Sequence, residues 1–257
     1  LGSVTKNVWT DLDGDGKKSK DDRFGFMINY SNAADNLKEA FEIYVTKKGD
    51  DGLPKLTFMN ERTQRALEKL NTYFATNDVL FSADIDEYDT LSKKAFREGR
   101  AMIVALNLGS ANEMRPMDDD FGIIPYPKLD SKQKEYHSTA QDNFSFFVAP
   151  IDVKDAEMTS IITEALASES YKNVIPVFYD VALKTKSARD EESSAMIDLI
   201  RDTLTFDFGY INSGALDSPG HLWIELLRKS SNDLASEYAK KETSYNEKLS
   251  ALLEAYR

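Results

Sequence analysis

The segment 90–110 restricts the possible folds of this chain more than any other. It reads TLSKKAFREGRAMIVALNLGS and begins with a helical pattern that carries Leu91, Ala95 and Phe96. Gly99 then supplies a helix stop, and the apolar run 101–106 follows as a buried strand. A helix, a glycine and a buried strand in succession indicate an α/β unit. We therefore expect an α/β fold.

Neighbouring segments extend this pattern. RFGFMINY at 23–30 predicts a strand, and the glycine-containing stretch 42–58 predicts a hairpin. NERTQRALEKLNTYF predicts an amphipathic helix with Asn60 as its N-cap. DFGIIPYPK at 120–128 and NFSFFVAP at 143–150 predict two short strands, each ended by a proline.

Beyond residue 150 apolar side chains recur at a spacing of three to four, so the C-terminal half is predicted to be mostly helical. Asp190 opens one of these helices with its acidic end first, as the helix dipole prefers. The last predicted helical stretch, 232–257, carries one apolar stripe: Leu234, Tyr238, Tyr245, Leu249, Leu252 and Tyr256.

The stretch TDLDGDGKKSKDDRFG at 10–25 has the form of a calcium loop. Aspartates at alternate positions can direct oxygens at one hard cation, and the glycine at position six permits a sharp turn. An aspartate at position twelve and a lysine at position eight indicate a single unpaired loop, similar to dockerin-type loops. The alternative is a solvated acidic turn, given the lysines and arginine nearby. The predicted ligands of a structural Ca²⁺ are Asp11, Asp13, Asp15, the Lys17 carbonyl and Asp22.

Composition limits the partners. The 257 residues carry a net charge of -12, which disfavours nucleic acid, and no cysteine, which excludes disulfides and thiol chemistry. No run approaches the roughly 18 apolar residues of a membrane span, and the first residues lack the pattern of a signal peptide. A calcium loop of modest affinity is most useful where calcium is plentiful, which favours an extracellular location.

Catalytic motifs are scarce. The two histidines, His137 and His221, stand outside H-E-x-x-H, and no G-x-S-x-G occurs. The carboxylates of 118–120 could in principle act as a glycosidase pair, but an aspartate run before a strand is more often a solvated turn. We therefore expect no enzymatic activity.

A sugar site needs aromatic faces that stack on rings and polar side chains that bind hydroxyls. Such residues stand at the ends of the predicted strands, where α/β folds bind ligands. The predicted ligand-binding residues are Tyr30, Asn107, Asn112, Arg115, Asp142 and Asn143.

Several short motifs follow one another in a specific order. They are FREGRAMIVALNLGS, DFGIIPYPKLDSKQKEYHS, QDNFSFFVAP and VIPVFYDVALKTKSARDEES. This order resembles the extracellular solute-binding proteins, family 1 type, of bacterial ABC sugar importers. The lipoproteins of Firmicutes are the most similar, and some of them carry a segment like Trp9–Gly16.

The resemblance implies a type II periplasmic-binding-protein fold. Family members are longer, with a signal, a lipid-bearing cysteine and most of the first lobe upstream, so this chain is expected to be incomplete, a C-terminal portion. Residues 1–100 would belong to the second lobe, 101–150 would cross to the first, and 151–257 would form the helical C-terminal part.

The implied function is capture of a sugar or oligosaccharide for a membrane permease by a cell-surface lipoprotein, whose lipid anchor lies outside this chain. The first alternative is a calcium-dependent adhesion or scaffold module, and the second is a glycoside-processing enzyme.

Overall fold

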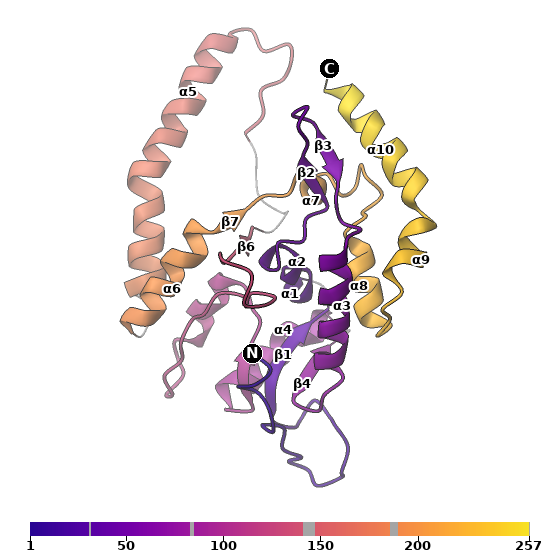
Figure 1. The fold of residues 1–257 in the computed structure, drawn as a ribbon. Coiled ribbons are helices and arrows are strands. Elements are labelled where there is room, and N and C mark those ends of the chain that lie inside the picture. The colour runs from indigo at the N-terminus through magenta and orange to yellow at the C-terminus, as the bar shows by residue number, and fades with distance from the viewer. Residues whose placement is uncertain (31, 83–84, 141–146, 186–189, 257) are drawn as a thin grey trace. The chain divides into compact units, whose positions relative to one another are not determined.

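The computed structural model describes residues 1–30, 32–82, 85–140, 147–185 and 190–256 (Figure 1). It is a mixed α/β structure that divides into two compact units. Unit 1 comprises residues 1–108, 125–140 and 200–257, and unit 2 comprises 109–124 and 141–199. The units do not coincide with the ranges 1–100, 101–150 and 151–257, whose assignment to lobes stays a prediction.

The centre of unit 1 is a parallel sheet in the strand order β4-β1-β5. β1 is Phe24–Asn29, β4 is Val79–Ser82 and β5 is Ala101–Val104. In the register, Phe26 of β1 lies opposite Val79 on one side and Ile103 on the other. All six residues of β1 are buried, as expected for a central parallel strand. The strands predicted over 23–30 and 101–106 are confirmed, the latter ending at Val104.

Helices cover both faces of this sheet. Phe26 and Ile28 point into a core with Leu67 of α3 (Glu61–Phe74) and Trp223 of α8 (His221–Arg228). Met27 points to the opposite face because strand side chains alternate, and it contacts a second cluster with α4 (Ile85–Arg97). Three layers around one sheet confirm the α/β unit predicted from 90–110.

Two predicted helix boundaries are confirmed: the start of α3 at Asn60 and the end of α4 at Gly99. Asn60 caps α3 by accepting a hydrogen bond from the Thr63 amide at 3.0 Å. After α4, Gly99 adopts φ of 67°, a left-handed conformation that ends a helix and favours glycine.

Short elements complete unit 1. β2 (Thr46–Lys48) and β3 (Pro54–Leu56) form the predicted antiparallel hairpin. β6 (Ser138–Thr139) and β7 (Leu204–Thr205) pair in parallel. The remaining helices are α1 (Asn32–Asp35), α2 (Leu37–Ala40), α7 (Phe208–Ile211), α9 (Leu234–Ala239) and α10 (Glu242–Ala255).

The C-terminal apolar stripe is buried over most of its length. Leu234, Tyr238, Tyr245 and Leu249 lie in the core, whereas Leu252 is half-buried and Tyr256 is exposed. The tyrosines of α9 and α10 pack on each other, with ring centroids 5.4 Å apart. The prediction of a packed helical C-terminus is therefore confirmed up to Leu249.

The strand predicted over 120–128 is wrong. This segment has no regular secondary structure. Pro125 and Pro127 remove two backbone N–H donors, and the Ile123 amide donates instead to the Ser193 hydroxyl at 3.1 Å. Of the strand predicted over 143–150, residues 143–146 lie outside the described part, and 147–150 have no strand structure.

The regular secondary structure of unit 2 is helical in its described part. It contains α5 (Ala156–Glu169), the π-helical segments η2 (Ser170–Val174) and η3 (Val177–Thr185), most of the 3₁₀ helix η1 (Leu108–Met114) and most of α6 (Glu191–Asp202). Asp190 accepts a hydrogen bond from the Ser193 amide and caps α6, in agreement with the acidic start predicted for this helix.

The apolar side chains of unit 2 are largely exposed. No residue of α5, η2 or the described part of η3 is buried, although these elements are rich in isoleucine, valine and leucine. Exposed large residues include Met158, Ile161, Ile162, Leu166, Tyr171, Val174, Ile175, Val177, Phe178 and Val181. In the described ranges, no helix is both long and apolar enough to cross a membrane.

Candidate functional site

The acidic loop brings three predicted metal ligands together. One carboxylate oxygen from each of Asp11, Asp13 and Asp15 lies within 4.8 Å of the others, a spacing that suits a shared cation. The three side chains are exposed or partly exposed. This is the donor set that a hard cation prefers.

Backbone amides fold the loop around Asp11. Its Oδ1 accepts a hydrogen bond from Gly14 at 2.7 Å, and its Oδ2 accepts one from Gly16 at 2.7 Å. Both glycines have positive φ, 76° and 75°, which residues with a Cβ rarely adopt. The glycine at position six therefore serves the tight turn that the sequence predicts.

The pKa values of Asp11 and Asp13 shift in opposite directions. The Gly16 amide lowers the pKa of Asp11, outweighing its partial burial. The Asp15 amide also favours the charged form of Asp13, but partial burial and the neighbouring Asp11 and Asp15 together raise the pKa of Asp13. Crowded negative charge of this kind is relieved by a cation.

The other two predicted metal ligands, Asp22 and Lys17, lie in the same loop and make hydrogen bonds within it. Asp22 is fully buried, and its carboxylate accepts hydrogen bonds from the Ser19 amide at 2.8 Å, the Leu12 amide at 3.1 Å and the Trp9 indole at 3.3 Å. It therefore closes the base of the loop and is not part of the three-carboxylate group. The Lys17 amide donates to Asp15 at 2.7 Å. A metal contact from Asp22 or from the Lys17 carbonyl stays a prediction.

The loop is fastened to the edge of the sheet where the three parallel strands begin. Lys18 donates to the carbonyl of Val79 at 3.1 Å, at the start of β4. Arg100, just before β5, donates to the carbonyls of Lys20 at 3.2 Å and Asp22 at 3.4 Å. In Figure 1 the loop projects from the lower ends of β1 and β4.

Asp78 adds a further tie at this edge. Its carboxylate accepts hydrogen bonds from the amides of Asn7, Val8 and Trp9 at 2.8 to 3.0 Å. Partial burial opposes the charge, yet these amides lower the pKa of Asp78. The sequence offered no signal for this residue, because its partners lie about 70 positions away.

Two predicted ligand-binding residues follow the C-terminal ends of the parallel strands, away from the acidic loop. Tyr30 comes directly after β1, is half-buried, and has Arg228 over its ring at 4.6 Å. Asn107 comes three residues after β5 and is exposed. Both therefore follow the carboxyl ends of parallel strands, where α/β sheets bind ligands. One face of the Tyr30 ring is already covered by the guanidinium.

The other predicted ligand-binding residues divide into two groups. Asn112 and Arg115 are exposed in unit 2, where the guanidinium donates to the Asn112 amide oxygen at 2.6 Å. Asp142 and Asn143 lie outside the described residues. The structure thus pairs Asn112 with Arg115, and a single site made by all six residues stays a prediction.

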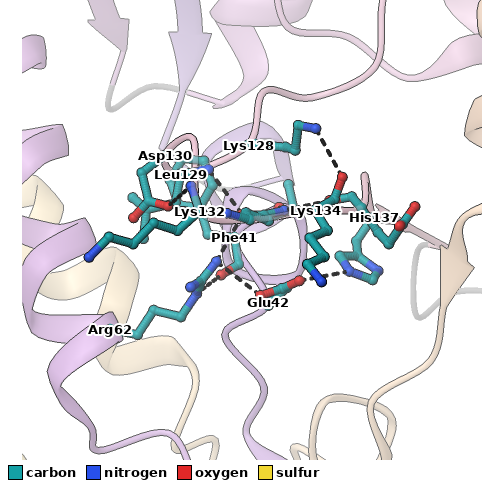
Figure 2. A network of polar contacts seen from close by, with 12 residues as sticks. Phe41, Glu42, Arg62, Lys128, Leu129, Asp130, Lys132, Lys134 and His137 are labelled. Carbon is teal, nitrogen blue, oxygen red and sulfur yellow. Dashed lines mark hydrogen bonds and ion pairs between the residues drawn. The ribbon is translucent and has the colours of Figure 1, made fainter.

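A polar network in unit 1 was not expected from the sequence (Figure 2). Arg62 pairs with Glu42 at 3.0 Å and donates to the Gln133 side chain at 2.9 Å, while the Nε2 atom of His137 lies 3.3 Å from Glu42. Gln133 is buried and also donates to the carbonyl of Ala40 at 2.8 Å. These contacts join residues far apart in sequence, so no local pattern predicts them.

A second unexpected cluster is buried beside α2. Lys38 and Glu39 are each 1% exposed, and Asp207 is 3% exposed. Lys38 pairs with Asp35 at 2.6 Å, and Asp207 accepts hydrogen bonds from the amides of Val45, Thr46 and Gly209. Burial raises the pKa of Glu39 to about 8. The sequence DNLKEA gave no sign that these charges are internal.

The residues considered for catalysis are exposed or, in the case of His137, partly exposed. The side chains of 118–120 are exposed, as expected of a solvated turn, and His221 is exposed at the start of α8. His137 lies 3.3 Å from Glu42 and packs edge-on against the Tyr44 ring. No protein family, curated protein or solved structure matches this chain.

Proposed function

We propose that this chain is the C-terminal portion of an extracellular solute-binding protein that captures a sugar or oligosaccharide for an ABC importer, without chemical conversion. The observation that carries the proposal is the architecture of unit 1. Its parallel β4-β1-β5 sheet has helices on both faces and has Tyr30 and Asn107 just past the carboxyl ends of its strands. The resemblance of the ordered motifs to solute-binding proteins supplies the ligand class.

The path of the chain supports a two-lobed binder of the type II class. The polypeptide passes between the compact units four times, after residues 108, 124, 140 and 199. Multiple connections between two bodies suit hinge closure around a ligand. In this proposal the two units correspond to the second lobe and part of the first.

The exposed apolar side chains of unit 2 support the view that this lobe needs further polypeptide. α5 has no buried residue, yet it carries the exposed apolar side chains of Met158, Ile161, Ile162 and Leu166, which a helix normally packs against other elements. In a first lobe completed by an upstream segment, these side chains would be buried.

Calcium has a structural role in this proposal. Asp11, Asp13 and Asp15 would hold the ion, with the Lys17 carbonyl and Asp22 as further ligands. The loop is fastened where the parallel strands begin, whereas Tyr30 and Asn107 follow the ends of the strands. The ion would therefore stabilise the sheet without touching the sugar. The protein would act as a cell-surface lipoprotein, with the lipid anchor on the upstream part and a membrane permease as its partner.

A calcium-dependent adhesion or scaffold module is the second candidate, because exposed apolar surface also suits protein contacts. Isothermal titration of a polypeptide extended upstream, against a panel of oligosaccharides, separates the two. Saccharide binding with the sugar recovered unchanged supports the importer component. Failure to bind any saccharide, together with binding to a protein surface, would favour the adhesion module.

A further inference from the structure

Arg228, the last residue of α8, places a positive charge beside Tyr30. Its guanidinium carbon lies over the Tyr30 ring, 4.6 Å from the ring centroid. Arg228 is exposed and forms no ion pair with any residue that the structure describes. Acids are plentiful, because the chain carries 44 acidic and 32 basic residues, and Glu225 stands one turn earlier on the same helix. This guanidinium is therefore a cation without an acidic partner in the described part of the chain.

The Tyr30 ring is held in place by the sheet and the core. The Tyr30 amide donates to the carbonyl of Ser82, at the end of β4, at 2.9 Å, and the side chain packs against the main core cluster. Just before it, the Asn29 side chain accepts a hydrogen bond from the Ala33 amide at 2.9 Å, which fixes the turn between β1 and α1. The aromatic surface under the guanidinium is therefore part of a well-packed region.

α8 is fastened to the same turn. The buried Trp223 indole donates to the carbonyl of Ala34 in α1 at 3.0 Å, and Leu226 and Leu227 lie in the core. Arg228 follows these buried residues directly, so the helix places the backbone of Arg228 although its side chain is exposed. Two packed elements of unit 1 thus bring the cation and the ring together.

A guanidinium over an aromatic ring can still bind an anion. Its five N–H donors point outward in the plane of the group, where they match the two oxygens of a carboxylate. The contact with the ring also restricts the long side chain, so less conformational freedom is lost when an anion binds. The net charge of -12 repels anions in general, so an acidic ligand would require a local cation of this kind.

The cation lies at the end of the sheet where a ligand is expected. Met27 of β1 pairs with Val104 of β5, and Tyr30 and Asn107 each stand three residues beyond that pair. Ligands of α/β folds bind past the carboxyl ends of parallel strands. The acidic loop is fastened at the other end of the strands, so its charge does not account for Arg228.

We propose that the captured saccharide is acidic and that Arg228 selects it, by binding an oxyanion on the sugar beside the Tyr30 ring. This inference rests on the proposed function, because a sugar must be captured at this end of the sheet. It adds the class of the sugar, an oligosaccharide that contains uronic acids or sulfate esters. Both sources present the same chemistry to the guanidinium, a negatively charged group of oxygens.

The test is isothermal titration of the upstream-extended polypeptide against trisaccharides in matched pairs. Galacturonic, glucuronic and mannuronic acid trimers are compared with their methyl esters, and sulfated galactose trimers with unsulfated ones. We expect the acidic member of at least one pair to bind roughly tenfold or more tightly than its neutral counterpart. The difference should shrink as salt is added, because ions screen the charge of an exposed guanidinium. The pair that shows the difference identifies the source of the oxyanion.

Three variants assign the preference. Arg228→Gln is expected to weaken binding of the acidic trisaccharide by roughly ten- to hundredfold and to leave the neutral one little changed. Arg228→Lys keeps the charge but lacks the planar donors, so an intermediate affinity is expected. Lys229→Gln is the matched control, because it removes the same charge from the next exposed position and is expected to bind as the wild type does. Urea unfolding of each variant checks that it is folded.

The results separate this inference from the proposed function. Equal or tighter binding of the neutral member in every pair would overturn the inference and leave sugar capture standing. An acidic preference that is unchanged in folded Arg228→Gln, or lost equally in Lys229→Gln, would also overturn it. Absence of binding to every saccharide would contradict both.

Discussion

Glu39 is the residue whose environment conflicts most with its chemistry. It is 1% exposed, and burial raises its pKa from 4.5 to about 8. A carboxyl with a raised folded-state pKa binds its proton more tightly in the folded protein, so stability falls as pH rises from about 4.5 to about 8. The neutral form of Glu39 is the one that suits the fold.

Glu39→Gln is therefore predicted to be more stable than the wild type above pH 8, by about 5 kcal/mol at most, and to gain little below pH 4.5. The measurement is urea unfolding at pH 4, 7 and 9, with Glu247→Gln as an exposed control. A Glu39→Gln variant that lost stability at pH 9 would contradict the account of this site.

Asp13 has a raised pKa, and its crowded charge is predicted to be relieved by calcium. Asp13→Ala should abolish the rise in melting temperature that calcium is predicted to give the wild type, because it removes one of the three grouped carboxylates. In chelator the variant should be no less stable than the wild type, since a repulsive charge is gone. Calcium at 100 times its Kd is expected to stabilise the wild-type fold by about 2.7 kcal/mol.

Asp21→Ala is the matched control for this measurement. It removes the same charge from the same loop, but its exposed side chain lies outside the three-carboxylate group. Equal wild-type melting temperatures in excess calcium and in chelator would contradict the prediction that the acidic loop binds calcium. A retained calcium response in Asp13→Ala would show that the ion binds elsewhere.

At the scale of elements, the N-terminal segment depends on one side chain between α3 and β4. Asp78 accepts three backbone amides, from Asn7, Val8 and Trp9, and its carboxyl is partly exposed. Asp78→Ala is predicted to destabilise unit 1 by about 2 kcal/mol. The free energy of unfolding of this variant is measured in urea. The control is Asp50→Ala, which changes an exposed residue in the β2–β3 turn. Equal stability of the two variants would show that the three hydrogen bonds to Asp78 contribute little.

Local sequence patterns correctly predicted helices and strands whose buried side chains recur at the regular spacing of a helix or a strand. α3 begins after Asn60 as expected, and α4, Gly99 and β5 follow in the predicted order. The segment 120–128 misled because its apolar residues suggest a strand while its prolines prevent a ladder.

The polar clusters could not be predicted because they depend on tertiary contacts. Gln133 bonds to Ala40, 93 positions away, and Thr139 bonds to Glu39, 100 positions away. The grouping of the acidic loop was predictable because its aspartates are close in sequence and its glycines are required by the turn. Asp22 was assigned from the loop template alone, yet its carboxylate bonds to two amides and an indole.

At the scale of the whole molecule, the two units differ in how they bury apolar surface. Unit 1 has buried hydrophobic clusters on both faces of its sheet, whereas α5 has no buried residue. Amides of α5 are therefore predicted to exchange with solvent much faster than those of α3 in this chain, and to become protected when the upstream sequence is restored. Hydrogen exchange of both polypeptides tests this. Strong protection of α5 in the short chain would contradict the view that its surface needs a cover from upstream.

The central claim is that the complete protein holds a saccharide between two lobes without altering it. Isothermal titration of the upstream-extended polypeptide against plant and host oligosaccharides, with the sugar recovered and analysed afterwards, tests it most directly. We expect at least one saccharide to bind with a Kd in the micromolar range or tighter, roughly -8 kcal/mol, and to be recovered intact. The short chain is expected to bind the same saccharide weakly, because the proposal assigns one wall of the site to the upstream polypeptide. Hydrolysis of the sugar, or the absence of binding to every saccharide tested, would contradict the account.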